Sequence, residues 1–270
     1  MAGTQHLHLD RGVPDVRIRT LSLHDLRVAL RQGWEDFLDK RGDLVFVGFI
    51  YPLVGFLAIA IARNWSLLPI FFPLVAGLTL MGPAVASGFY EMARRRERGM
   101  NSSWRHFFLE FKSPAMPSIA ALTALQFGIY VLWLMAAWAV YAATMGPVRP
   151  DAWAVLPDSP EIFLHDLFAT QAGWTMIIVG NLVGLIFAIA VLSISVISFP
   201  MLIDGKADVY RAVKTSVRVT AHNFRVILTW GLMVAILLFL GCVTAFVGLA
   251  VVLPVLGYAT WHLYTRAVER

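Results

Sequence analysis

Apolar residues are gathered into five stretches without Asp, Glu, Lys or Arg: Leu44–Ala62, Asn64–Tyr90, Ser113–Val148, Leu167–Ile203 and Val226–Thr265. Each stretch matches or exceeds the ~20 apolar residues that one helix needs to cross a ~30 Å hydrocarbon layer. A spanning segment must satisfy its own backbone polar groups, so helices are the structure that these stretches predict. We therefore expect an all-α fold, a polytopic membrane helical bundle.

The number of spans depends on how the longest stretches divide. Val226–Thr265 would measure about 60 Å as one straight helix, so two spans joined near Gly241–Gly248 fit better. After trimming at Pro and Gly residues, we predict six spans, at about 44–62, 67–90, 118–144, 173–200, 226–244 and 246–264. Five spans are the alternative if Leu253-Pro254 marks a kink or a re-entrant turn. Residues 1–21 are expected to form a tail, and residues 22–270 a single transmembrane domain.

Basic residues predict the orientation. With six spans, all of the 22 Lys and Arg residues except Arg63 and Arg149 fall on one side of the membrane. The positive-inside rule then places both termini in the cytoplasm.

Three segments on that side are predicted to be amphipathic interfacial helices. In Ser22–Lys40, apolar residues recur at helical spacing while charged residues occupy the other faces, and Ser22 with Asp25 resembles a capping box. Aromatic residues form a second stripe at Trp104, Phe107, Phe108 and Phe111. A third stripe comprises Tyr210, Val213, Val217 and Ala221, opposite Arg211, Lys214 and Arg218.

These stripes fit either of two partners, the lipid bilayer or another membrane protein. The first segment is slightly acidic, whereas a helix meant only for anionic lipid should be basic, so we favour packing against the spans or a partner there. The candidate contacts are Trp34, Phe37, Trp104 and Phe108.

Composition agrees with a membrane protein, because 59% of the residues are hydrophobic and only 14% are charged.

The first 43 residues lack an uninterrupted apolar core, so no cleavable signal peptide is expected. The net charge of +5 is distributed by membrane side, as in the cluster Arg94–Arg98, which is expected to fix topology and touch anionic lipid. Nucleic acid is therefore not expected as a partner.

The predicted spans contain few polar side chains, chiefly Gln126, Asn181, Ser193, Ser195 and Ser198, and none of these is ionisable. Proton relays and ion sites usually need charged groups, so an energised transporter is disfavoured. Gly180, Asn181 and Gly184 form a GxxxG arrangement, which predicts close helix packing.

The second predicted span is rich in Pro and Gly, from Pro69 to Gly88. It indicates either a kinked packing helix or a broken helix that lines a cavity.

No cofactor, metal site or catalytic set can be assigned from spacing. Only His262 lies within an uncharged stretch, at its end, so paired intramembrane haem ligands are lacking. The single cysteine, Cys242, offers no zinc spacing. Each histidine is expected to form interfacial hydrogen bonds, and the chain is not expected to be an enzyme.

Two segments resemble a bacterial family of predicted integral membrane proteins with no established function. They are Ala29–Phe37, continuing through Asp43-Leu44 to Ile50–Gly55, and Gly82–Glu91 with the arginine cluster that follows. The resemblance implies a multi-pass protein of the bacterial inner membrane. Some members are labelled putative cytochrome c oxidase subunit I, but a haem-copper core needs several intramembrane histidines that this chain lacks.

Three functions are therefore considered. A scaffold or assembly factor acting through the cytoplasmic helices is favoured. The alternatives are a channel or passive carrier, and an accessory protein of a respiratory oxidase complex.

Overall fold

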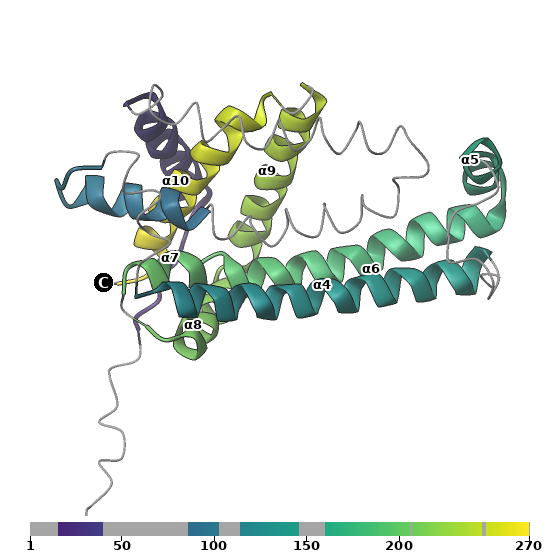
Figure 1. The fold of residues 1–270 in the computed structure, drawn as a ribbon, viewed down its shortest axis with the longest axis horizontal. Coiled ribbons are helices and arrows are strands. Elements are labelled where there is room, and N and C mark those ends of the chain that lie inside the picture. The colour runs from purple at the N-terminus through teal and green to yellow at the C-terminus, as the bar shows by residue number, and fades with distance from the viewer. Residues whose placement is uncertain are drawn as a thin grey trace, which may run out of the picture.

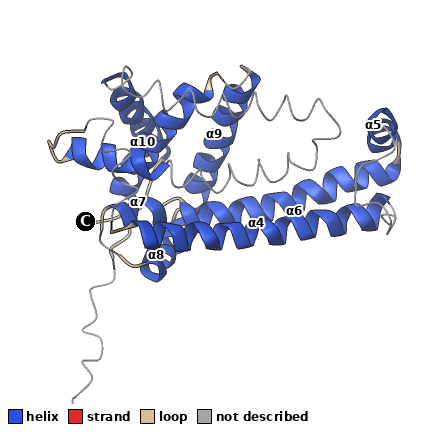
Figure 2. Ribbon diagram, in the orientation of Figure 1, coloured by secondary structure: helices blue, strands red, loops and turns tan. Residues whose placement is uncertain are grey.

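The computed structural model describes residues 16–39, 86–102, 114–145, 160–205, 207–244 and 247–269. Within these ranges the chain is helical apart from turns and one isolated bridge, between Ile18 and Val268, which confirms the all-α class (Figure 2). The predicted span at 44–62 and most of the one at 67–90 lie outside the described residues.

The longest helices form an antiparallel hairpin. α4 (Met116–Met145) and α6 (Gln171–Ser195) lie side by side along most of their length (Figure 1). The short α5 (Pro160–Ala169) precedes α6, and Thr170 caps α6 by accepting a 3.0 Å hydrogen bond from the Gly173 N–H. After a turn at Val196 and Ile197, α7 (Ser198–Ile203) continues toward the end of the molecule where α4 begins.

The remaining helices are α8 (Val209–His222), α9 (Phe224–Val243) and α10 (Leu249–Ala267). α9 and α10 pack against each other as a second hairpin. Two helices thus replace one long helix in the last apolar stretch, with α9 ending at Val243 and α10 beginning at Leu249, while the two predicted spans there stay a prediction. α10 runs through Pro254 without a break, so the predicted alternative of a re-entrant turn there is not the structure adopted.

Three segments in the described part are long and apolar enough to cross a membrane: Met116–Met145, Gln171–Ile203 and Phe224–Val243. They correspond to the predicted spans 118–144, 173–200 and 226–244. α10 corresponds to the predicted span 246–264, but it does not meet the same measure of length and hydropathy.

Buried side chains gather at one end of the molecule, where the two hairpins meet. This core is built by residues 21–37 and 89–93, the first turns of α4 and α9, α7, one face of α8 and the second half of α10. Away from it, the hairpins expose large apolar side chains such as Leu132, Trp138, Ile186 and Phe239. Extended apolar surface of this kind is what helices in contact with lipid tails present.

Two helical segments hold α10 from either side, and we call this arrangement the clamp: residues 23–39 and 86–97 packed on α10. A Cβ atom at Gly33 would lie 2.7 Å from both the Ala259 nitrogen and the Val255 oxygen of α10. On the other side, a Cβ at Gly257 would lie 2.7 Å from the Phe89 Cβ. Glycine at these two positions therefore sets how closely the backbones approach.

The two ends of the described chain pair beside the clamp. The Arg19 N–H donates to the Ala267 oxygen at 2.9 Å, and the Glu269 N–H donates to the Arg17 oxygen at 3.1 Å. Asn223, between α8 and α9, joins this contact by accepting a 2.7 Å hydrogen bond from the Leu21 N–H. Segments far apart in the sequence are therefore fastened at one end of the molecule.

We predict that Gly33→Ala destabilises the protein, because its methyl group meets α10 backbone that cannot rotate away. The expected loss is about 1–3 kcal/mol, typical of an overpacked contact, measured by thermal unfolding in detergent.

Gly180→Ala is the matched control, since nothing among the described residues lies within 4 Å of a Cβ there. It should melt at or slightly above the parent temperature, because Ala favours helix by up to ~1 kcal/mol. Equal melting of both variants would contradict the close approach of Gly33.

Candidate functional site

The centre of the clamp is a buried carboxylate. Asp36 is only 6% exposed. Its Oδ1 lies 2.9 Å from the Arg96 Nε, and its Oδ2 lies 2.8 Å from the His262 Nε2. Arg96 also pairs with Asp39 at the surface. Because a buried charge is stable only when it is paired, Asp36 requires all three segments of the clamp to be in place.

Arginines near Arg96 hold two further buried carboxylates. Glu91 is 2.6 Å from the Arg94 Nε and 2.7 Å from the Arg95 Nε. Asp204, at the end of α7, accepts hydrogen bonds from Arg98 at 2.8 Å and from the Tyr264 hydroxyl at 3.0 Å. The Arg94–Arg98 cluster, which the sequence suggested for topology and lipid contact, thus also makes structural ion pairs.

The helix over 23–39 is tied to α10 at its first turn as well. Ser22 and Asp25 make the reciprocal bonds of the expected capping box, with Ser22 N–H to Asp25 Oδ2 at 2.9 Å and Asp25 N–H to Ser22 Oγ at 3.3 Å. The hydrogen bond from the Ser22 hydroxyl, with a smaller contribution from Arg266, holds the pKa of Asp25 below its ordinary value. The charged Asp25 lies 3.3 Å from Arg266.

A polar cavity of about 320 Å³ opens at this junction. Its walls carry both signs of charge, from Glu35, Asp36, Arg96, Glu97, His262 and Arg266. Several of these groups already bond one another, and the Trp261 Nε1 donates to Glu97 at 3.2 Å. Among the described residues, no group of three or more His, Cys, Asp or Glu side chains could hold a metal ion. His262, which is hydrogen-bonded to Asp36, instead helps to hold the clamp together.

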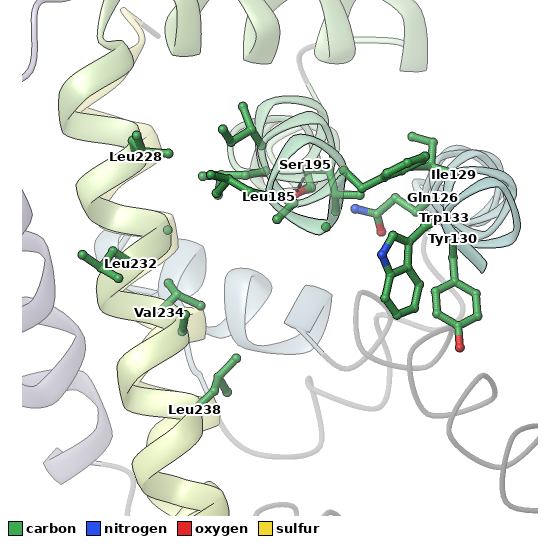
Figure 3. A pocket seen from close by; sticks show the side chains of 18 of the residues that line it. Gln126, Ile129, Tyr130, Trp133, Leu185, Ser195, Leu228, Leu232, Val234 and Leu238 are labelled. Atoms are coloured by element: carbon green, nitrogen blue, oxygen red, sulfur yellow. Dashed lines mark hydrogen bonds between the residues drawn. The ribbon is translucent and has the colours of Figure 1, made fainter. Parts of the chain in front are cut away.

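A larger, apolar cavity of about 1050 Å³ lies between α9 and the α4–α6 hairpin. Figure 3 shows Gln126, Ile129, Tyr130 and Trp133 of α4, Leu185 and Ser195 of α6, and Leu228, Leu232, Val234 and Leu238 of α9 around it. The cavity exists because α9 diverges from α4 and α6 as it leaves the core (Figure 1).

The GxxxG residues of α6 do not make a close contact with another described helix. Space is open around Gly180, and the nearest atom to a Cβ at Gly184 is the Trp133 Nε1 at 3.8 Å. The Asn181 amide donates to the Ile177 oxygen of its own helix at 2.7 Å. Their proposed part in helix packing stays a prediction, and Gly184 instead lines the apolar cavity.

The candidate contacts of the first amphipathic segment have different environments. Phe37 is buried in the core, whereas Trp34 is 45% exposed, with the two rings 5.7 Å apart. Trp104 and Phe108 lie outside the described residues. In α8, Tyr210, Val217 and Ala221 of the predicted stripe are exposed, whereas Val213 packs against the core beside the buried Ala212, Ser216 and Val219.

Sequence reasoning did not find the ion pairs that centre on Asp36 and Asp204. Only Glu91 had a readable signal, because Arg94 and Arg95 follow it at the i,i+3 and i,i+4 spacing of helical ion pairs. The partners of Asp36 are 60 or more residues away, and no local pattern announces them.

Comparison with known families bears on the membrane character of this fold. The family model described as "Predicted integral membrane protein (DUF2189)" matches residues 71–204. The match covers just under half of the chain, and the function of this family is unknown. The suspected resemblance is thereby confirmed, and the DUF2189 match includes the segment Gly82–Glu91. It ends after α7, so α8, α9 and α10 follow the DUF2189 domain, and Ala29–Gly55 precedes it. Neither a curated protein nor a solved structure matches the chain.

We predict that Asp36→Asn lowers the free energy of unfolding by about 3 kcal/mol, since breaking a buried ion pair leaves its partners uncompensated. Denaturant unfolding in detergent measures this loss, and an Asp36/Arg96 double-mutant cycle isolates the pair.

Asp39→Asn is the control, because the Asp39 side chain is mostly exposed and a surface pair is worth ~0–1 kcal/mol. If both substitutions lower the free energy of unfolding by a similar amount, the loss comes from removing a partner of Arg96 and not from the burial of Asp36.

Proposed function

We propose that this protein is a non-enzymatic scaffold or assembly factor that docks other membrane components through the helix over residues 23–39. The observation that carries the proposal is an apolar strip on the outer side of this helix, beside the face packed on α10. Its members are Leu23, Trp34 and Leu38, and we call them the outer strip. Leu23, Trp34 and Leu38 are each more than one-third exposed.

The helix that bears the outer strip is held in a fixed position. Leu26, Ala29 and Phe37 are buried in the core, and Gly33 meets the α10 backbone. A pre-organised apolar surface loses little conformational entropy on binding, which favours affinity. The outer strip is therefore suited to a partner of defined shape.

Charge around the outer strip supports a protein partner over a lipid surface. Arg31 and Glu35 pair across one turn at 3.6 Å, so the polar border of the strip carries both signs of charge. Helices that lie on anionic membranes usually present Lys and Arg along this border. An apolar centre with an exposed Trp and a mixed polar rim is the composition of protein–protein interfaces.

We also propose the finer topology of six spans with both termini on the cytoplasmic side of the bacterial inner membrane. Support comes from the contacts that join Arg19 to Ala267, Asp36 to Arg96 and Arg98 to Asp204. Segments in direct contact share one side of a membrane, so the chain must cross an even number of times between them. Basic residues concentrate in these same segments, which favours the cytoplasm.

A photo-crosslinking residue at Leu38 is predicted to give protein adducts in native membranes, because the outer strip faces a partner. The same residue at Ile178, exposed on α6, should give lipid adducts only. Adding Trp34→Ala should weaken the Leu38 adducts, whereas Trp174→Ala, at a similarly exposed Trp in α6, should leave them unchanged. Lipid adducts alone at Leu38 would contradict docking of a protein.

Reporter fusions are predicted to place residue Gly99 and the carboxyl terminus on the cytoplasmic side and residue Asp158 outside. Because Glu97, just before Gly99, accepts a hydrogen bond from Trp261 of α10, the first two reporters are required to agree. A carboxyl terminus outside, with Gly99 inside, would exclude six spans and the proposed sidedness together.

A further inference from the structure

Polar groups in the wall of the apolar cavity collect at one end of it. Ser195 is the last residue of α6, and Arg225 and Thr229 lie in the first turns of α9, whereas Gln126 lies about three turns into α4. α9 begins at the core and α6 ends there (Figure 1), so Ser195, Arg225 and Thr229 lie toward this end of the cavity. The cavity is therefore amphipathic along its length.

Arg225 supplies a positive charge at this polar end. Among the described residues, no ion pair includes Arg225, in contrast to Arg96 and Arg98. The Asn223 side chain, which could cap α9, instead bonds Leu21 and Arg19. The first N–H groups of α9 therefore add a partial positive charge beside Arg225.

Gln126 adds a second polar group further along the cavity wall, about three turns into α4. Its amide points from α4 toward α6 (Figure 3), and it has no hydrogen-bond partner among the described residues. A half-buried amide in apolar surroundings favours a ligand with a hydrogen-bonding group. The neighbouring hydroxyls of Ser195 and Thr229 donate to their own helices but keep acceptor capacity.

Beyond this end the walls are apolar over a length suited to lipid tails. At 1.5 Å per residue, Leu238 lies about 20 Å along α9 from Arg225. This distance exceeds the ~15 Å depth of one leaflet of a ~30 Å hydrocarbon core. The volume of about 1050 Å³ can hold the headgroup-proximal part of a phospholipid, since ligand clefts of ~300–1,000 Å³ accept drug-sized molecules.

We propose that the cavity between α4, α6 and α9 binds one anionic phospholipid of the surrounding bilayer. The headgroup phosphate accepts hydrogen bonds from Arg225 beside the first N–H groups of α9, and the acyl chains lie along the apolar walls toward Leu238. Basic pockets between membrane helices bind anionic headgroups in this way. The lipid lies between α9 and the α4–α6 hairpin and contacts both.

Native mass spectrometry of the full chain in mild detergent tests the site, with phosphatidylglycerol and phosphatidylcholine as the two probes. We expect one phosphatidylglycerol to bind the parent more tightly than phosphatidylcholine. Arg225→Gln should remove this preference by lowering phosphatidylglycerol affinity about tenfold, the effect of losing a ~1.5 kcal/mol charge-assisted hydrogen bond. Gly184→Leu should weaken both lipids, because its side chain enters the cavity beside Trp133.

Two controls share the chemistry of these changes but lie outside the cavity. Lys214→Gln removes one exposed positive charge from α8, and Gly180→Leu adds the same side chain to α6. Both should bind lipid like the parent.

The proposal is overturned if the parent shows no preference, if Lys214→Gln loses as much affinity as Arg225→Gln, or if Gly184→Leu binds normally. A change in oligomeric state caused by Gly184→Leu, with lipid binding intact, would assign the cavity to a second copy instead. Should Gly184→Leu fail to fold, Arg225→Gln still decides the question, because Arg225 is exposed.

Discussion

The close approach of Gly33 to the backbone of α10 is the contact on which the rest of the structure depends. Asp36 follows Gly33 by three residues, and His262 follows Ala259 by three, so both side chains lie one turn further along the contact. A bulkier residue at 33 would separate the helices and pull the buried carboxylate from its partner. Arg96 completes the clamp from a third segment, which makes its assembly cooperative.

The clamp explains why the core lies at one end of the molecule. Ion pairs and close packing fasten the terminal segments, the arginine cluster and α7 there, while the spans leave as two diverging hairpins. Helices in lipid gain little from apolar burial against one another, because the tails are as apolar as their side chains. Their arrangement must therefore be fixed at the core, where removing apolar side chains from water is favourable. Lipid can then occupy the space between the hairpins.

The same physics separates the two faces of the first amphipathic helix. The buried face contributes Leu26, Ala29, Gly33 and Phe37 to the clamp, and the outer strip remains exposed. A surface that is both apolar and rigidly held is the basis of the docking role proposed above. The polar cavity beside Asp36 is lined by the ion pairs that stabilise the clamp.

The sequence by itself determined the all-α class, the three described spans, the division between α9 and α10 and the capping box at Ser22, because each follows from local periodicity, length or spacing. It also predicted the aromatic anchors, but it did not separate buried Phe37 from exposed Trp34, which lie on adjoining faces. Only the tertiary structure decided the partners of Asp36 and Asp204, the glycine contacts of α10 and the core-facing side of α8. These depend on segments up to 226 residues apart, whose meeting is set by packing and not by local pattern.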